Sequence, residues 1–159
     1  MLLLLLRHAT AEPHGATPDP ERALVAKGWK QARRAGAFCR RHDFVPDVVL
    51  TSPLVRARQT AGEFARTAGA PDPVVVPWLD LGHPPGSLDE LAAYRSLATV
   101  CLVGHEPDFS ALAALLIGCP PEGLRVRKAS LVGIDCPSPV VPGGGQLLFS
   151  IPNALMEEG

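Results

Sequence analysis

The 159-residue sequence predicts an α/β protein, a three-layer α/β/α sandwich with a mostly parallel central sheet. Short apolar runs of strand length alternate along the chain with windows of helical periodicity. The earlier runs are apolar on successive residues, as strands buried on both faces are. Prolines fall between these segments, and a proline interrupts helices and central strands.

Six segments have the length and composition of strands. The first four are apolar on successive residues, which predicts burial on both faces. The last two are joined by residues 137–145, and they either form a hairpin or add an antiparallel strand to the sheet. In chain order the six segments are 2–6, 48–50, 74–76, 99–103, 130–134 and 146–151.

Four windows between these strands carry helical features. The second window, 54–68, follows Ser52 and Pro53, a predicted N-cap and first helical position. The third follows the Ser-x-x-Glu capping-box pattern at 87–90, and the fourth is predicted to end at Gly118. In the first window, one helical stripe is formed by Val25, Trp29, Ala32, Gly36 and Cys39.

Length and charge restrict the organisation of the chain. At about 150 residues per domain, we expect a single domain over 1–159. A net charge of -1 excludes a protein that binds nucleic acid or anionic lipid mainly through its overall charge.

The apolar run at 1–6 is too short for a secretory signal or a membrane span, so we expect a cytoplasmic protein with no membrane partner. The cysteines lack CxxC spacing, so we expect free thiols and no metal site.

Polar side chains follow three of the predicted buried strands. The first strand ends in Arg7 and His8, and the fourth is followed by His105. Arg56 lies about one turn into the helix that follows the second strand. Ligands bind at the carboxyl ends of strands in such sheets, where helix N-termini add N–H donors. The sequence therefore predicts that two imidazoles and two guanidinium groups converge at one edge of the sheet.

This group of side chains suits a phosphoryl dianion. Arginines offer paired donors to phosphate oxygens and stay charged at any working pH. A neutral imidazole can attack phosphorus, and a second, protonated one can stabilise the charge of transfer without a metal. On spacing alone, structural histidines and solvated arginines remain the alternative.

Three ordered motifs resemble those of the histidine phosphatase superfamily, the phosphoglycerate mutase-like group. They are Arg7-His8-Ala9 after the first strand, SPLVRARQTA at 52–61, and Gly-His-Glu-Pro at 104–107. The small size and the segment 22–28 look most like the SixA-type phosphohistidine phosphatases, and the resemblance covers most of residues 1–118.

The resemblance implies that His8 is a nucleophile that becomes phosphorylated. Arg7, Arg56 and His105 would then complete the phosphate pocket, with no metal and no organic cofactor. The implied substrate is phosphohistidine on a protein. A phosphatase of small phosphomonoesters with the same mechanism, and a phosphate- or phosphoprotein-binding module of low turnover, are the alternatives; we expect no nucleic-acid partner.

The sequence departs from the family pattern in three ways. Ala9 stands where the family usually has glycine. No residue securely matches the acid that protonates the leaving oxygen in many relatives, although Asp80 and Glu106 lie in suitable regions. The stretch 70–99 is short and proline-rich, which predicts an open site. An open site without a dedicated acid favours phosphohistidine, because solvent can protonate its basic leaving nitrogen.

Overall fold

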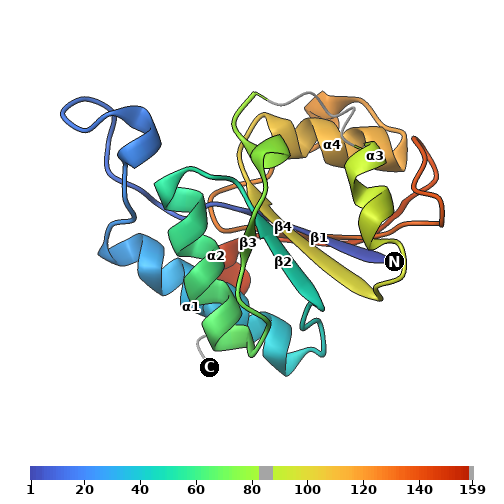
Figure 1. The fold of residues 1–159 in the computed structure, drawn as a ribbon, viewed down its shortest axis with the longest axis horizontal. Helices are drawn as coiled ribbons and strands as arrows, with labels where there is room; N and C mark the ends of the chain where they lie inside the picture. The colour runs from blue at the N-terminus through green and yellow to red at the C-terminus, as the bar shows by residue number, and fades with distance from the viewer. Residues whose placement is uncertain (83–87, 158–159) are drawn as a thin grey trace.

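The computed structural model describes residues 1–82 and 88–157, and it has the predicted α/β architecture (Figure 1). A six-stranded sheet with the order β3-β2-β4-β1-β5-β6 forms its middle layer. The strands are β1 (Leu2–Arg7), β2 (Val48–Thr51), β3 (Val74–Val75), β4 (Thr99–Gly104), β5 (Leu131–Asp135) and β6 (Gln146–Ile151). All six predicted strands are thus present, and none of their ends is shifted by more than one residue.

The four strands β1 to β4 are parallel, and the other two extend the sheet on the β1 side. β1 and β2 both pair with β4, and β3 pairs with β2. β5 is antiparallel to β1, and β6 is antiparallel to β5. The last two strands therefore pair with each other and also extend the sheet, which combines the two arrangements that the sequence left open.

Helices cover both faces of the sheet. α1 (Ala26–Arg41) and α2 (Val55–Ala68) pack against one face, and α3 (Leu88–Leu91) and α4 (Asp108–Ile117) lie over the other (Figure 1). α4 ends at Gly118 in the left-handed conformation, as predicted. Single-turn 3-10 helices occupy Asp19–Glu21, Pro77–Leu79, Ala92–Tyr94, Pro121–Gly123 and Asn153–Leu155.

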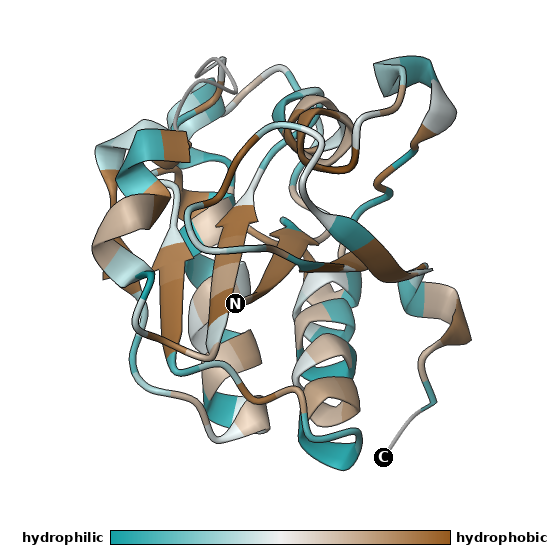
Figure 2. Ribbon diagram, turned by 90° about the vertical axis from the view of Figure 1, so that its right-hand side faces the viewer, coloured by the Kyte–Doolittle hydropathy of each residue, from teal (hydrophilic) through white to brown (hydrophobic). Residues whose placement is uncertain are grey.

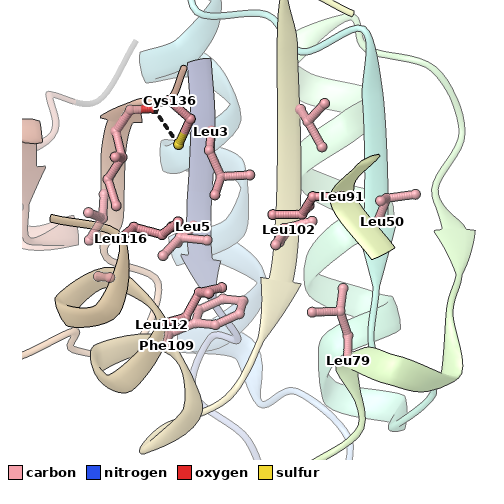
Figure 3. Packing of buried hydrophobic residues seen from close by; sticks show 14 of the residues in the cluster. Leu3, Leu5, Leu50, Leu79, Leu91, Leu102, Phe109, Leu112, Leu116 and Cys136 are labelled. Atoms are coloured by element: carbon pink, nitrogen blue, oxygen red, sulfur yellow. Dashed lines mark hydrogen bonds between the residues drawn. The ribbon is translucent and has the colours of Figure 1, made fainter. Parts of the chain in front are cut away.

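The leucine run of β1 divides its side chains between the two layers of the core. Leu3 and Leu5 pack with residues of α3 and α4, including Phe109 (Figure 3). Leu4 and Leu6 pack with residues of α1 and α2. Successive strand residues point to opposite faces, so a strand covered on both sides needs an apolar residue at every position. Figure 2 shows the resulting apolar strands at the centre of the fold.

Two local predictions are wrong. β3 is an edge strand of two residues, and Val74 and Val75 are 49% and 48% exposed rather than buried. α2 begins at Val55, so Ser52 and Pro53 precede the helix instead of capping it. The hydroxyl of Ser52 accepts a hydrogen bond from the Leu54 N–H at 3.2 Å.

Ser87, the first residue of the predicted capping box, lies outside the described residues. Within 1–82 and 88–157, none of the helices has the length and apolar character that crossing a bilayer requires. The single domain over 1–159 stays a prediction.

Candidate active site

His8 lies directly after β1, with its side chain only 7% exposed. Its Nδ1 lies 2.8 Å from the carbonyl oxygen of Ala9, and a carbonyl can only accept a hydrogen bond. The neutral ring therefore carries its hydrogen on Nδ1. This leaves a lone pair on Nε2, the nitrogen that a nucleophilic imidazole uses.

His105 follows β4, the parallel neighbour of β1. Because Arg7 is in register with Gly104, the two residues after these strand ends are adjacent, and the rings of His8 and His105 are 5.3 Å apart between centroids. His105 is 1% exposed, and its Nε2 lies 2.7 Å from the hydroxyl oxygen of Ser52. If that hydroxyl donates to Nε2, the neutral ring carries its hydrogen on Nδ1.

The two arginines predicted to bind phosphate come from different elements. Arg56, in the first turn of α2, is 2% exposed and donates from Nη1 to the Asp19 carbonyl oxygen at 2.8 Å. Arg7, the last residue of β1, donates from Nη1 to the carbonyl oxygen of Val126 at 3.1 Å. Nε of each arginine and Nδ1 of His105 are buried without a hydrogen-bond partner among the described residues. The two Nε–H groups are donors, and Nδ1 of His105 is a third when it carries the ring hydrogen; unpaired N–H groups of this kind are suited to an anion.

All four predicted site residues line one cavity of about 510 Å³. They reach it from the end of β1, the first turn of α2 and the end of β4, as expected from the shared carboxyl edge of a parallel sheet. The cavity is also lined by Ala11, Glu12, Pro13, His14, Asp19, Arg22, Leu81, Glu106 and Lys128.

Burial keeps both imidazoles neutral at neutral pH. It lowers the pKa of His8 from 6.5 to about 3, and the positive charges of Arg56 and Arg7 act in the same direction. Burial also lowers the pKa of His105, to about 4. A neutral His8 is ready to act as a nucleophile. His105 is neutral too before an anion arrives, and a phosphoryl dianion beside it favours the protonated form.

Comparisons with known proteins agree with this geometry. The model of the histidine phosphatase superfamily (branch 1) matches residues 3–79. An uncharacterised protein of Picosynechococcus sp. is 32% identical over 142 residues, which cover 84% of each chain. The chain belongs to the histidine phosphatase superfamily.

Solved structures share the fold of this histidine phosphatase superfamily member over its whole length. A protein histidine phosphatase, SixA, complexed with tungstate, has a TM-score of 0.88 at 23% identity, covering 99% of this chain and 100% of that one. The alpha-ribazole phosphatase of Shigella flexneri has a TM-score of 0.74 at 21% identity, with 100% of both chains covered. At these identities the likeness establishes the fold.

Asp19 is a residue of the histidine phosphatase cavity that the sequence did not reveal. Its carboxylate accepts from Arg22 Nε at 2.9 Å and lies 3.3 Å from Arg56 Nη2 and 3.4 Å from His14 Nδ1. The hydrogen bond from Arg22 is the main cause that lowers the pKa of the Asp19 carboxyl. Asp19 is therefore ionised and holds the guanidinium of Arg56 in place. Asp19 lies between two prolines in a single-turn 3-10 helix, where no periodic pattern could have predicted this role.

The two acid candidates are placed differently with respect to the cavity. Glu106 lines it, but its carboxylate accepts hydrogen bonds from the backbone N–H and the hydroxyl of Ser110, at the start of α4. Asp80 is not part of the lining, and its Oδ1 accepts from the Leu81 N–H at 2.7 Å. Asp80 nevertheless acts on the site through its charge, which offsets part of the lowering that burial causes in the pKa of His105.

The alanine that replaces the family's usual glycine fits the turn after His8. Among the described residues, left-handed backbone angles outside glycine occur at Asp43 and Ala129, so Ala9 avoids that strain. Ala9 is fully buried, and its N–H donates to the hydroxyl of Thr60 in α2 at 3.0 Å. The turn therefore forms without glycine.

The loop after Ala9 is held by α1. The backbone N–H and the hydroxyl of Thr10 both donate to Oε1 of Gln31 at 2.9 Å. Gly28 lies against the same loop, and a Cβ on it would fall 2.1 Å from the Thr10 carbonyl oxygen. A side chain at position 28 is thus excluded by the backbone that follows His8.

Metal ligands do not gather in the part of the chain that the structure describes. Within 1–82 and 88–157 there is no group of three or more His, Cys, Asp or Glu side chains placed to hold an ion. The four cysteines are free; Cys39, Cys101 and Cys136 are buried and Cys119 is half-buried.

Proposed function

We propose that this chain hydrolyses phosphohistidine on proteins through a covalent phospho-His8 intermediate, without a metal ion. The observation that carries the proposal is a buried neutral His8, with Nε2 available, in one cavity with His105, Arg7 and Arg56. The fold shared with a SixA bound to tungstate, a tetrahedral oxyanion, gives further support.

The proposed reaction has two displacements at phosphorus. In the first, Nε2 of His8 forms a bond to phosphorus while the P–N bond of the substrate breaks, and the leaving imidazole takes a proton from solvent. In the second, water attacks the phosphorus of phospho-His8 and loses a proton. The P–N bond to His8 then breaks, and inorganic phosphate and free His8 result.

The cationic groups would stabilise the charge on the transferred phosphoryl oxygens. Arg7 and Arg56 carry permanent charge and paired N–H donors. His105 becomes protonated as the dianion arrives, because an opposite charge nearby raises its pKa. Donors placed in advance need little reorganisation during transfer, which makes this kind of stabilisation effective.

The state of the acidic residues favours a P–N bond over a phosphate ester. Glu106 is held by Ser110, and Asp19 is held ionised by Arg22 and Arg56. An ester oxygen leaves poorly without a proton donor, whereas an imidazole nitrogen is basic enough to take its proton from water. A small phosphomonoester is the second candidate substrate, because an alpha-ribazole phosphatase shares the fold over the full chain.

A substrate panel tests the choice of substrate. We expect turnover of a phosphohistidine peptide and of phosphoramidate to exceed that of sugar phosphates and alpha-ribazole phosphate. Sugar-phosphate or alpha-ribazole phosphate turnover far above phosphoamidase turnover would reject phosphohistidine and favour the second candidate.

A chelator tests the metal-free mechanism. We expect EDTA to leave the turnover rate unchanged, and inhibition that a divalent ion reverses would reject the metal-free mechanism.

Rapid-quench labelling tests the covalent intermediate. Radioactive phosphate from the substrate should appear on the wild-type chain as acid-labile, base-stable label, and it should be absent from His8→Ala. His42→Ala removes an exposed histidine just after α1 and should label like the wild type. Turnover without label in the wild type would reject the intermediate, and neither turnover nor label would indicate a binding module.

A further inference from the structure

A second hollow of about 640 Å³ adjoins the active-site cavity. The two share Arg7, Glu106 and Lys128 as lining residues, so they are continuous along one side. The second hollow is also lined by Lys27, from the start of α1, and by Arg125 and Arg127, from the segment before β5. Nothing in the proposed chemistry uses it.

Four exposed cations surround this hollow, and we call them the basic surface: Lys27, Arg125, Arg127 and Lys128. Among the described residues, none of the four forms an ion pair. The carboxylate in the lining, Glu106, is already engaged by Ser110. Since the whole chain carries a net charge of -1, this positive charge is a local concentration beside the active site.

We propose that the basic surface docks an acidic segment of the phosphorylated protein, close to its phosphohistidine. This inference rests on the proposed function. Exposed cations that lack internal partners repel one another, and an acidic partner relieves that repulsion while steering encounter toward the cavity. The shared residue Lys128 joins the basic surface to the cavity edge, so a substrate can fill both at once.

The lining favours protein over the other anionic ligands. No Phe, Tyr or Trp lines either hollow in the described residues, whereas single-stranded nucleic acids are held largely by stacking on aromatic rings. The four cations are exposed and do not enclose a small molecule, whose binding depends on burial in a concave site. An acidic chain segment needs only several charges at the right spacing.

A matched pair of peptides tests the docking. Both carry one phosphohistidine, and roughly three glutamates lie within about eight residues of it in one peptide and are replaced by glutamines in the other. For the wild type at low salt we expect kcat/KM to be about tenfold higher on the acidic peptide, and the preference to shrink as salt is raised.

Charge-reversed variants locate the effect on the protein. Arg125→Glu combined with Arg127→Glu should abolish or invert the preference while leaving phosphoramidate turnover unchanged. Arg40→Glu combined with Arg95→Glu gives the same change in net charge at exposed positions. Arg40 is about 20 Å from Lys27 along α1, and this control should keep the preference. Equal kcat/KM on both peptides, or a preference lost equally in the control, would overturn the proposal.

Binding to His8→Ala separates docking from catalysis. This variant should bind the acidic peptide, with or without its phosphoryl group, about tenfold more tightly than the glutamine peptide. That result would support docking even if phosphohistidine were not the substrate, whereas equal binding would reject docking even if phosphohistidine were hydrolysed. A single-stranded oligonucleotide that binds more tightly than the acidic peptide, and is lost in the Arg125/Arg127 variant, would assign the surface to nucleic acid instead.

Discussion

The chemistry of this protein depends on which nitrogen of each imidazole carries a hydrogen. The Ala9 carbonyl holds the hydrogen of His8 on Nδ1, one residue from the ring itself. The hydroxyl of Ser52, just after the end of a different strand, lies 2.7 Å from Nε2 of His105, and a hydroxyl that donates there places the ring hydrogen on Nδ1. Both contacts orient a buried ring that would otherwise have two equivalent ways to sit in the cavity.

We expect Arg56 to stabilise the transferred phosphoryl group through its charge and its paired N–H donors. We expect Arg56→Ala to lower kcat/KM by about 10²- to 10³-fold, because a donor to the transferred oxygens is lost. Arg56→Lys keeps the charge without the planar fork and should recover part of the loss. Steady-state kinetics on phosphoramidate would measure both. Arg58→Ala, at an exposed site two residues away, should remain near wild type, and an Arg56→Ala enzyme of full activity would contradict the assigned role.

Ser52 should act on catalysis through His105. Ser52→Ala leaves Nε2 of a buried ring without its partner, and we expect kcat to fall about tenfold, in line with one lost hydrogen bond. Thr51→Ala is a matched control, since its buried hydroxyl donates to the Ser52 carbonyl oxygen and not to His105. If both variants lose stability but keep kcat, Ser52 has only a structural role.

Among the helices and strands, the close approach of α1 to the loop after β1 restrains the position of His8. Gly28 allows the helix backbone to meet the Thr10 carbonyl, and Gln31 ties the same loop by two hydrogen bonds. From α2, Thr60 accepts the Ala9 N–H. Two neighbouring helices thus restrain Ala9 and Thr10, the residues that follow His8.

A methyl group at position 28 should displace this loop. We expect Gly28→Ala to lower the free energy of unfolding by about 1–3 kcal/mol and to reduce activity, because a Cβ 2.1 Å from a backbone oxygen forces a shift. Gly62→Ala, inside α2 with nothing within 4 Å of the new Cβ, should be neutral or up to about 1 kcal/mol stabilising. Urea unfolding would compare the two, and equal stabilities would contradict the close approach.

At the scale of the molecule, the buried imidazoles connect the site to the stability of the fold. Both rings are neutral in the folded chain, with the pKa near 3 for His8 and near 4 for His105, against 6.5 for an ordinary histidine. Below an ordinary histidine pKa, the unfolded chain binds protons that the folded chain does not. The two buried imidazoles therefore lower the free energy of unfolding in acid.

The free energy of unfolding should fall as pH decreases from 6.5 toward about 4. The contribution of the two neutral rings to the free energy of unfolding is fully present above the ordinary histidine pKa. It is lost as pH falls toward the pKa values of the folded chain, by at most about 1.4 kcal/mol per pH unit for each ring. Urea titrations of the wild type, His8→Asn and His105→Asn over this range would measure it. Each variant should show a shallower slope, and identical slopes would contradict the burial of neutral rings.

The layers of the fold and the elements that carry the site could be predicted from local sequence patterns. Continuous apolar runs such as 2–6 require cover on both faces, and the carboxyl ends of parallel strands share one edge, so His8, His105 and Arg56 were predicted to lie together. These inferences need only the local periodicity of the sequence and the rule that ligands bind at the carboxyl ends of parallel strands.

The contacts between segments far apart in the chain could not be predicted in this way. The pairing of Asp19 with Arg56, the hydroxyl of Ser52 at His105 and the exposed edge position of β3 depend on strand order and loop paths. No local spacing encodes them, because each joins residues brought together by packing. The same holds for the lowered pKa of both histidines, since burial and nearby charge exist only once the chain has folded.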